Sequence, residues 1–143
     1  MNKLGDVIFY SMDKAIRTYR TFAQHRLAEA GSDLTVDQWL VLNVVHDNPG
    51  LRQGAIAELV FKDGASVTRM IALMVRDGFI SRAIPEHDRR TVRLALTRKG
   101  QQQLRTLRPV VERYREHALS GVSDLEIQAL DRTLRKIMAN CDE

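Results

Sequence analysis

Along this chain of 143 residues, apolar residues follow a helical spacing except in one central region, where they alternate instead. Residues 80–84 and 92–96 alternate apolar and other side chains, as short strands do. The polar stretch 85–91, which opens on Pro85, separates them and predicts a hairpin with a charged tip. Because a lone two-stranded hairpin is marginally stable, it must lean on the helices around it. The chain is therefore predicted to be mainly α with one small β element.

Residues 4–30 place apolar side chains at steps of three and four, which predicts a single helix of more than 25 residues. Gly31 is expected to end it. A stripe this long extends beyond what a small globule can cover, so we expect it to meet a partner helix. The apolar positions are Leu4, Val7, Ile8, Met12, Ala15, Ile16, Tyr19, Phe22, Ala23, Leu27 and Ala30.

Three shorter helices are predicted next. Thr35 and Gln38 form a capping box that opens the first of them, and residues 48–50 (Asn-Pro-Gly) stop it. A short segment, 53–61, follows, although Gly54 near its start disfavours a helix. Asp63 is the expected N-cap of a helix over 64–77, which Gly78 ends. The first two segments contain the apolar residues Val36, Trp39, Leu40, Leu42, Val44, Val45, Ile56, Leu59 and Val60. In the third, Val67, Met70, Ile71 and Met74 are expected to face inward.

Two more helices follow the hairpin. Thr97 caps the first, and Pro109 inside it predicts a kink. Gly121 interrupts the chain, and Ser123 with Glu126 forms a second capping box. Their apolar stripes are Leu104, Leu107, Val111, Tyr114 and Ala118 in one, and Leu130, Leu134, Ile137, Met138 and Cys141 in the other.

The order of these elements is that of a winged helix-turn-helix over residues 33–97. The end segments 1–32 and 98–143 are left to pack on each other, and their stripes exceed what one copy can bury, so we expect a helical dimerisation region. The alternative is a monomer whose arms fold back on the core.

The positive charge is concentrated at the centre of the chain. The net charge is +4, yet residues 62–99 alone hold nine basic and four acidic residues, and the remainder holds 13 basic and 14 acidic residues. A local surplus of this kind indicates a phosphate-binding surface, or else a solvated basic face without a partner.

Several classes of protein are disfavoured. No signal-peptide layout or membrane-length apolar run is present, and Cys141 is the one cysteine, so we expect a cytoplasmic protein without an intrachain disulfide and without a membrane partner. The four histidines lack metal-ligand spacing, and no nucleophile motif or glycine-rich phosphate loop occurs. We therefore expect no enzyme, no catalytic residue, no metal and no cofactor.

Two runs of residues resemble the MarR family of bacterial transcription regulators. The first is Arg-Asp-Gly-Phe-Ile-Ser-Arg at 76–82, and the second is Asp-Arg-Arg-Thr-Val-Arg-Leu-Ala-Leu-Thr-Arg-Lys-Gly at 88–100. The resemblance covers nearly the whole chain and includes Leu34-Thr35 ahead of Trp39. Gly54 and Phe61 depart from it, since a good helix former and a small turn residue are more usual there.

The helix over 64–77 looks like the recognition helix of that family. Such helices read the major groove with their N-terminal half. Arg69 is the candidate for a base or phosphate contact, and Ser66 and Thr68 are the candidate hydrogen-bonding residues, although Ser66 could serve the helix cap alone. Arg76 is a further candidate, or it only complements the helix dipole.

The resemblance also assigns roles in the wing. It implies that Arg90 enters the minor groove while Asp88 holds its guanidinium, because a narrow groove attracts arginine. The alternative is an ordinary salt bridge within the hairpin. Arg89, Arg93 and Arg98 are then phosphate contacts or solvated charges.

The family resemblance further implies double-stranded DNA and a second copy of the chain as partners, a pseudo-palindromic site, and a small aromatic or phenolic effector. His25 and Trp39 are the candidate effector residues, set against a solvated histidine and a core tryptophan; Cys141 is taken as structural or incidental. The expected function is a dimeric repressor. The alternative is a helical protein-interaction module whose winged domain is degenerate.

Overall fold

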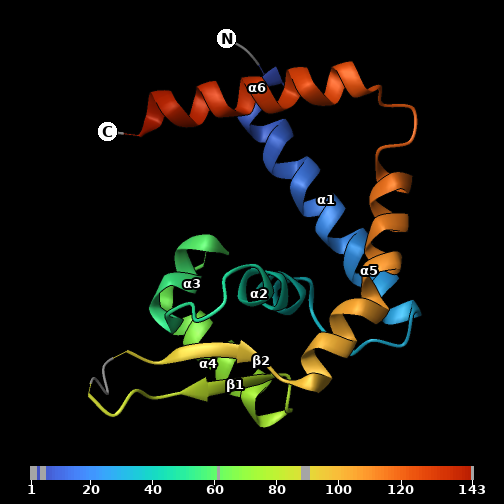
Figure 1. The fold of residues 1–143 in the computed structure, drawn as a ribbon. Coiled ribbons are helices and arrows are strands. Elements are labelled where there is room, and N and C mark those ends of the chain that lie inside the picture. Colours follow the sequence, from blue (N-terminus) through green and yellow to red (C-terminus); the bar gives the residue numbers. More distant parts are fainter. Residues whose placement is uncertain (1–2, 4–5, 61, 88–90, 143) are drawn as a thin grey trace.

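The computed structural model describes residues 3, 6–60, 62–87 and 91–142. Figure 1 shows α2, α3, α4 and the hairpin gathered at one end, α1 and α5 leading away from them, and α6 lying across the other end. The elements are α1 (Ile8–Glu29), α2 (Val36–Asp47), α3 (Gln53–Leu59), α4 (Gly64–Arg76), β1 (Ile80–Ala83), β2 (Arg93–Leu96), α5 (Arg98–Ala118) and α6 (Asp124–Cys141). This mainly helical winged architecture confirms the predicted fold class.

The wing is an antiparallel pair in which Ile80 lies opposite Leu96 and Ala83 opposite Arg93. Each strand is one residue shorter than its alternating pattern. An isolated bridge between Arg52 and Arg93 adds a short third segment, which the sequence did not predict. It fastens the wing to the chain that enters α3.

The helix starts follow the capping residues. Thr35 Oγ1 accepts from the Gln38 backbone N–H at 3.0 Å, and Gln38 Oε1 accepts from the Thr35 N–H at 2.9 Å. Ser123 and Glu126 form the second predicted box. Because capping needs partners only a few residues apart, these local signals were sufficient to place the helices.

The first helix is shorter than predicted. It runs for 22 residues from Ile8, because Val7 has extended backbone angles and makes no side-chain cap. The expected length of more than 25 residues was wrong; of the residues expected to open the helix, Leu4 lies outside the described part of the chain. Gly31, with a φ of +82°, ends it as predicted.

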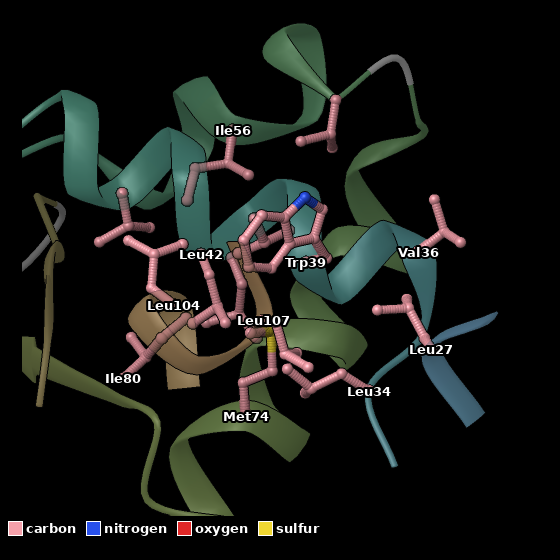
Figure 2. Close-up of a cluster of buried hydrophobic side chains, with 14 of the residues drawn as sticks. Leu27, Leu34, Val36, Trp39, Leu42, Ile56, Met74, Ile80, Leu104 and Leu107 are labelled. Atoms are coloured by element: carbon pink, nitrogen blue, oxygen red, sulfur yellow. The ribbon is translucent and has the colours of Figure 1, made fainter. Parts of the chain in front are cut away.

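A hydrophobic cluster joins the winged elements to the C-terminal half of α1 and to α5 (Figure 2). Trp39 is 3% exposed at its centre, and Val41, which was not among the predicted core residues, is fully buried. Leu59 and Ala118, which belong to the apolar patterns of their helices, are exposed, since each lies at a helix end. Pro109 lies inside α5.

The segment from Thr97 to Gly100 locks α5 onto the wing. Thr97 Oγ1 accepts from the Gly100 N–H at 3.0 Å and donates to the Gly78 carbonyl. A Cβ added at Gly100 would lie 2.2 Å from the carbonyl oxygen of Phe79. This close approach of two backbones explains why the run at 88–100 ends on a glycine.

The last helix, α6, buries none of its residues in this chain. Leu125, Leu130 and Met138 are 77%, 57% and 61% exposed. The apolar stripe of this amphipathic helix is thus largely exposed in the single chain.

Candidate nucleic-acid interface

Helix α4 separates an inner face from an outer one. Val67, Ile71 and Met74 are buried against the core, whereas Thr68 and Arg69 are exposed and Ser66 is half-buried. The division of faces is the one that the sequence predicts for the recognition helix. The outer face of its N-terminal half is the surface available to a duplex.

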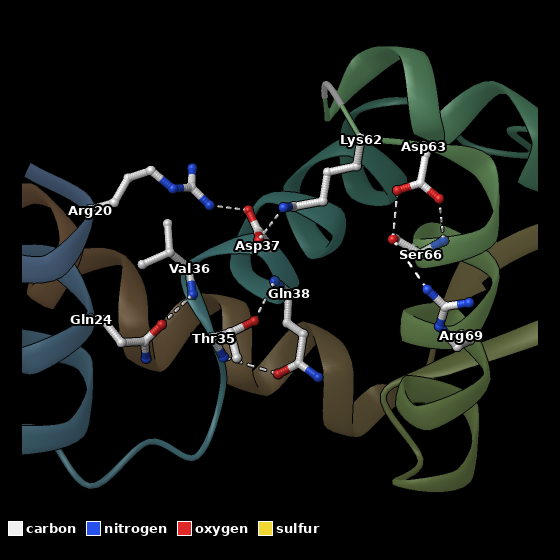
Figure 3. Close-up of polar contacts among 10 residues, drawn as sticks. All are labelled: Arg20, Gln24, Thr35, Val36, Asp37, Gln38, Lys62, Asp63, Ser66 and Arg69. Carbon is white, nitrogen blue, oxygen red and sulfur yellow. Dashed lines mark hydrogen bonds and ion pairs between the residues drawn. The ribbon is translucent and has the colours of Figure 1, made fainter. Parts of the chain in front are cut away.

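A chain of hydrogen bonds organises the start of α4 (Figure 3). Asp63 Oδ1 accepts from the Ser66 backbone N–H at 2.9 Å, and Oδ2 accepts from its hydroxyl at 2.6 Å. Arg69 Nη2 donates to Ser66 Oγ at 3.3 Å. The two hydrogen bonds from Ser66 lower the pKa of Asp63, so the cap stays ionised. Ser66 therefore takes part in the cap and also accepts a hydrogen bond from the guanidinium of Arg69.

Arg69 makes no ion pair with another residue in the described part of the chain, so its charge is available to an external anion. Thr68 Oγ1 donates to the Gly64 carbonyl at 2.8 Å and keeps its acceptor lone pairs free. Arg76 lies at the opposite end of α4, where its Nε pairs with Asp77 at 3.1 Å. The structure thus brings Ser66, Thr68 and Arg69 together and leaves Arg76 apart.

The wing supplies a second cationic feature. Arg93 is exposed, and its Nη1 donates to the Gly50 carbonyl at 2.7 Å. The predicted tip residues Asp88, Arg89 and Arg90 lie outside the described residues.

Three elements meet at Asp37, near the start of α2. Arg20 on α1 and Lys62, the residue before the α4 cap, both pair with its carboxylate, the latter at 3.0 Å (Figure 3). Burial raises the pKa of Asp37, but the hydrogen bonds from Arg20 and Lys62 outweigh it and lower the pKa on balance. This cluster could not be predicted from the sequence, because its members lie far apart in the chain.

Gln24 reinforces the same junction. Its Oε1 accepts from the Val36 N–H at 3.0 Å, and its Nε2 donates to the Leu34 carbonyl at 3.2 Å. One side chain of α1 thereby holds both sides of the turn into α2. The arm helix and the helix-turn-helix are joined by directional contacts as well as by the core.

The two candidate effector residues lie in different surroundings. Trp39 is a core residue, and its indole Nε1 has no hydrogen-bond acceptor among the described residues. His25 is exposed on α1. Neither lines the hollow of about 620 Å³ between α1 and α5, whose walls include Tyr19, Phe22 and His117.

Aromatic side chains dominate that region of the arms. Phe22 and His117 stack with ring centroids 5.4 Å apart, and Tyr114 packs edge-on against Tyr19 at 6.1 Å. Burial, followed by the neighbouring Tyr19, raises the pKa of Tyr114 to about 12, so its phenol stays protonated at neutral pH. The hollow offers flat apolar walls with polar edges.

The described residues contain no group of three or more potential metal ligands. No helix among them has the length and hydropathy needed to cross a bilayer. Cys141 is exposed and unpaired at the end of α6.

Comparison with known proteins gives a consistent result. The model of the MarR family matches residues 32–91. Over 110 residues, 77% of this chain and 73% of the relative, the chain is 31% identical to an uncharacterised HTH-type transcriptional regulator, YybA, from Bacillus subtilis (strain 168).

Solved structures share the fold over almost the whole chain. The transcriptional repressor CouR, solved bound to a 23-mer DNA duplex, is 26% identical with a TM-score of 0.84, and 96% of each chain is covered. Bordetella bronchiseptica BpsR, solved in a study of how 6-hydroxynicotinic acid regulates its DNA binding, is 20% identical with a TM-score of 0.86. That match covers 96% of this chain and 97% of BpsR, and it shows the fold.

Proposed function

Because this chain belongs to the MarR family of DNA-binding transcription regulators, we propose that it acts as a homodimeric repressor of transcription that reads a pseudo-palindromic site. Helix α4 enters the major groove, and the wing reaches the adjacent minor groove. Two-fold symmetry sets the half-sites about one helical turn apart.

The observation that carries this proposal is the outer face of α4. Thr68 and Arg69 are exposed beside a capped N-terminus, and Arg69 has a hydrogen bond to Ser66 but no carboxylate within ion-pair distance among the described residues. The guanidinium of Arg69 is oriented by one hydrogen bond and pairs with no carboxylate among the described residues. Such a group suits guanine O6 and N7, the commonest base partner of arginine.

Arg69→Ala tests the proposal. Selection from random duplexes should give wild-type protein a two-fold symmetric site, and the variant should lose preference at specific positions, at about 1–3 kcal/mol per lost base contact. Arg132→Ala removes the same charge from an exposed position of α6 and serves as the control. An identical selected motif for Arg69→Ala and wild type would refute the assignment.

Dimerisation is part of the same proposal. The exposed apolar residues of α6 and the N-terminal half of α1 need a partner surface; they include Ile8, Phe9, Leu125, Leu130 and Met138. A second copy of the chain supplies an identical surface under two-fold symmetry. Light scattering coupled to size exclusion should give twice the chain mass of 16.3 kDa.

A small aromatic or phenolic effector completes the proposal. The hollow between α1 and α5 presents Tyr19, Phe22 and His117, which suit a flat ring. A panel of aromatic carboxylates and phenols, added to the DNA complex, should contain compounds that change its Kd. A panel without effect on Kd would remove the effector from the proposal.

A further inference from the structure

A hollow of about 590 Å³ separates α4 from the base of the wing. Its walls come from the start of α3, from Gly64 and Thr68 on α4, and from Thr91 and Val92 ahead of β2. It therefore lies between the two elements that are proposed to read DNA.

Two glycines line this hollow, and neither the backbone conformation nor the packing of the chain requires glycine at these positions. Gly54 and Gly64 both have ordinary negative φ angles, and a Cβ added at either would meet nothing within 4 Å. Glycine within a helix costs stability relative to alanine. Where neither φ nor packing requires glycine, close approach of an external group is a remaining reason for it.

Arg52 lines this hollow, and Arg93 lies beside it in the chain pairing. Arg52 and Arg93 are opposite each other in the isolated bridge, flanked by the Gln53 N–H to Val92 carbonyl bond at 2.9 Å and the Leu94 N–H to Leu51 carbonyl bond at 3.0 Å. This is the non-hydrogen-bonded kind of antiparallel pair, in which side chains project to one face and come closest.

The charges of this pair are not compensated. Like charges directly opposite each other across a ladder are destabilising. Arg93 donates to the Gly50 carbonyl, whereas the Arg52 side chain makes no hydrogen bond or ion pair with the residues that the structure describes. A bound anion would relieve this repulsion.

The geometry of a duplex identifies the anion. A phosphodiester backbone is the ridge between the major and minor grooves, so a protein with α4 in one groove and its wing in the other must place that ridge across the surface between them. We propose that this hollow seats one backbone phosphate of the DNA, with Arg52 as its principal cation, Arg93 beside it, and Gly54 leaving room for the deoxyribose. This inference rests on the proposed function and adds a sequence-independent contact to it.

Arg52→Ala tests the charge. Titrations at several salt concentrations would use a duplex from upstream of the protein's own gene and an unrelated duplex of equal length. The variant dimer loses one contact in each half-site, so its affinity for both duplexes should fall by about tenfold per contact, or about a hundredfold in all. The slope of log K against log salt should fall by about 1.8, which is about 0.9 for each of the two contacts. Arg52→Lys should keep the wild-type slope, and so should Arg132→Ala, which removes a distant charge.

Gly54→Ala tests the space. Alanine should raise Tm, because it is the better helix residue and meets nothing in the free protein. It should nevertheless weaken binding to both duplexes severalfold, since its methyl group points into the space of the ligand. A gain in stability together with a loss of binding is not expected from a residue whose role is structural.

The outcomes separate this inference from the function beneath it. If wild-type protein binds neither duplex, the proposed function fails, and the phosphate seat fails with it. If wild-type protein binds while Arg52→Ala keeps the wild-type slope, or Gly54→Ala keeps the wild-type affinity, the hollow is a solvated surface feature and only the present inference is overturned.

Discussion

The Nζ atom of Lys62 lies 3.0 Å from Oδ2 of Asp37, which ties the residue before the α4 cap to the first turn of α2. Arg20 of α1 pairs with the other carboxylate oxygen, Oδ1. One acidic side chain, 19% exposed, thus connects α1 to the residue that precedes the α4 cap. Any rotation of α1 against the winged domain must either break these ion pairs or move α2 and the start of α4 with it.

Asp37→Asn is expected to lower the free energy of unfolding at pH 7 by about 1–2 kcal/mol, since two partly buried charge-assisted hydrogen bonds are lost. Because the folded-state pKa of Asp37 lies below its ordinary value of 3.8, this stabilisation is present above that value and is lost as pH falls through the folded pKa. The free energies of unfolding of the two proteins, measured with urea over a pH series, should therefore converge at acidic pH.

The matched control is Asp131→Asn, which breaks the exposed pair with Arg135 on α6. Surface pairs of this kind contribute little, so the urea midpoint should hardly move. If the difference in free energy of unfolding between wild type and Asp37→Asn stays constant down to the lowest pH, the carboxylate charge is not the source of the stabilisation.

Gly100→Ala is expected to destabilise the protein by about 3 kcal/mol or more, since its Cβ would meet the Phe79 carbonyl oxygen at 2.2 Å. The clash is with backbone, which cannot rotate away. Urea unfolding monitored by circular dichroism measures the change. A midpoint equal to that of wild type would contradict the packing of α5 on the wing.

Arg90→Ala tests the wing, whose tip lies outside the described residues. A cation in the minor groove acts largely without regard to base identity, so the variant should bind all duplexes more weakly and show a flatter salt dependence. Affinity measured at several salt concentrations decides this. Unchanged affinity and slope would leave the wing without the role that the family resemblance implies.

Leu130→Glu is expected to convert the protein from dimer to monomer, because it places a charge in the exposed apolar stripe of α6, where Leu130 is 57% exposed. Sedimentation equilibrium gives the mass directly. Gln128→Glu adds the same charge at a neighbouring exposed position outside the stripe and should remain dimeric. If both variants remain dimeric, the dimer interface does not include the apolar stripe of α6.

Prediction from sequence succeeded where the signal was local. The capping residues Thr35, Asp63 and Ser123 began helices as expected, and Gly78 ended one. It was less accurate at the N-terminus, where the apolar stripe continued past the helix start at Ile8. An apolar stripe reports which face is apolar, and it does not report where the backbone hydrogen bonds begin.

The candidate site divides in the same way. Ser66, Thr68 and Arg69 share a face because helical spacing fixes their relation. Arg52 lay outside the basic stretch 62–99 and gave no signal of its own, since its neighbour Arg93 is reached only through the bridge ahead of α3. The departure noted at Gly54 gains the reason proposed above only once the hollow beside it is known.

The sequence by itself determined the order of the elements, the helix starts and the surplus of positive charge at the centre of the chain. Those features depend on residues within a turn or two of each other, whose geometry the backbone dictates. The tertiary structure decided which charges meet: Asp37 with Arg20 and Lys62, Arg52 with Arg93, and the Gly100 backbone with Phe79. Such pairs join distant segments, and their distances are set by how the helices pack on one shared core.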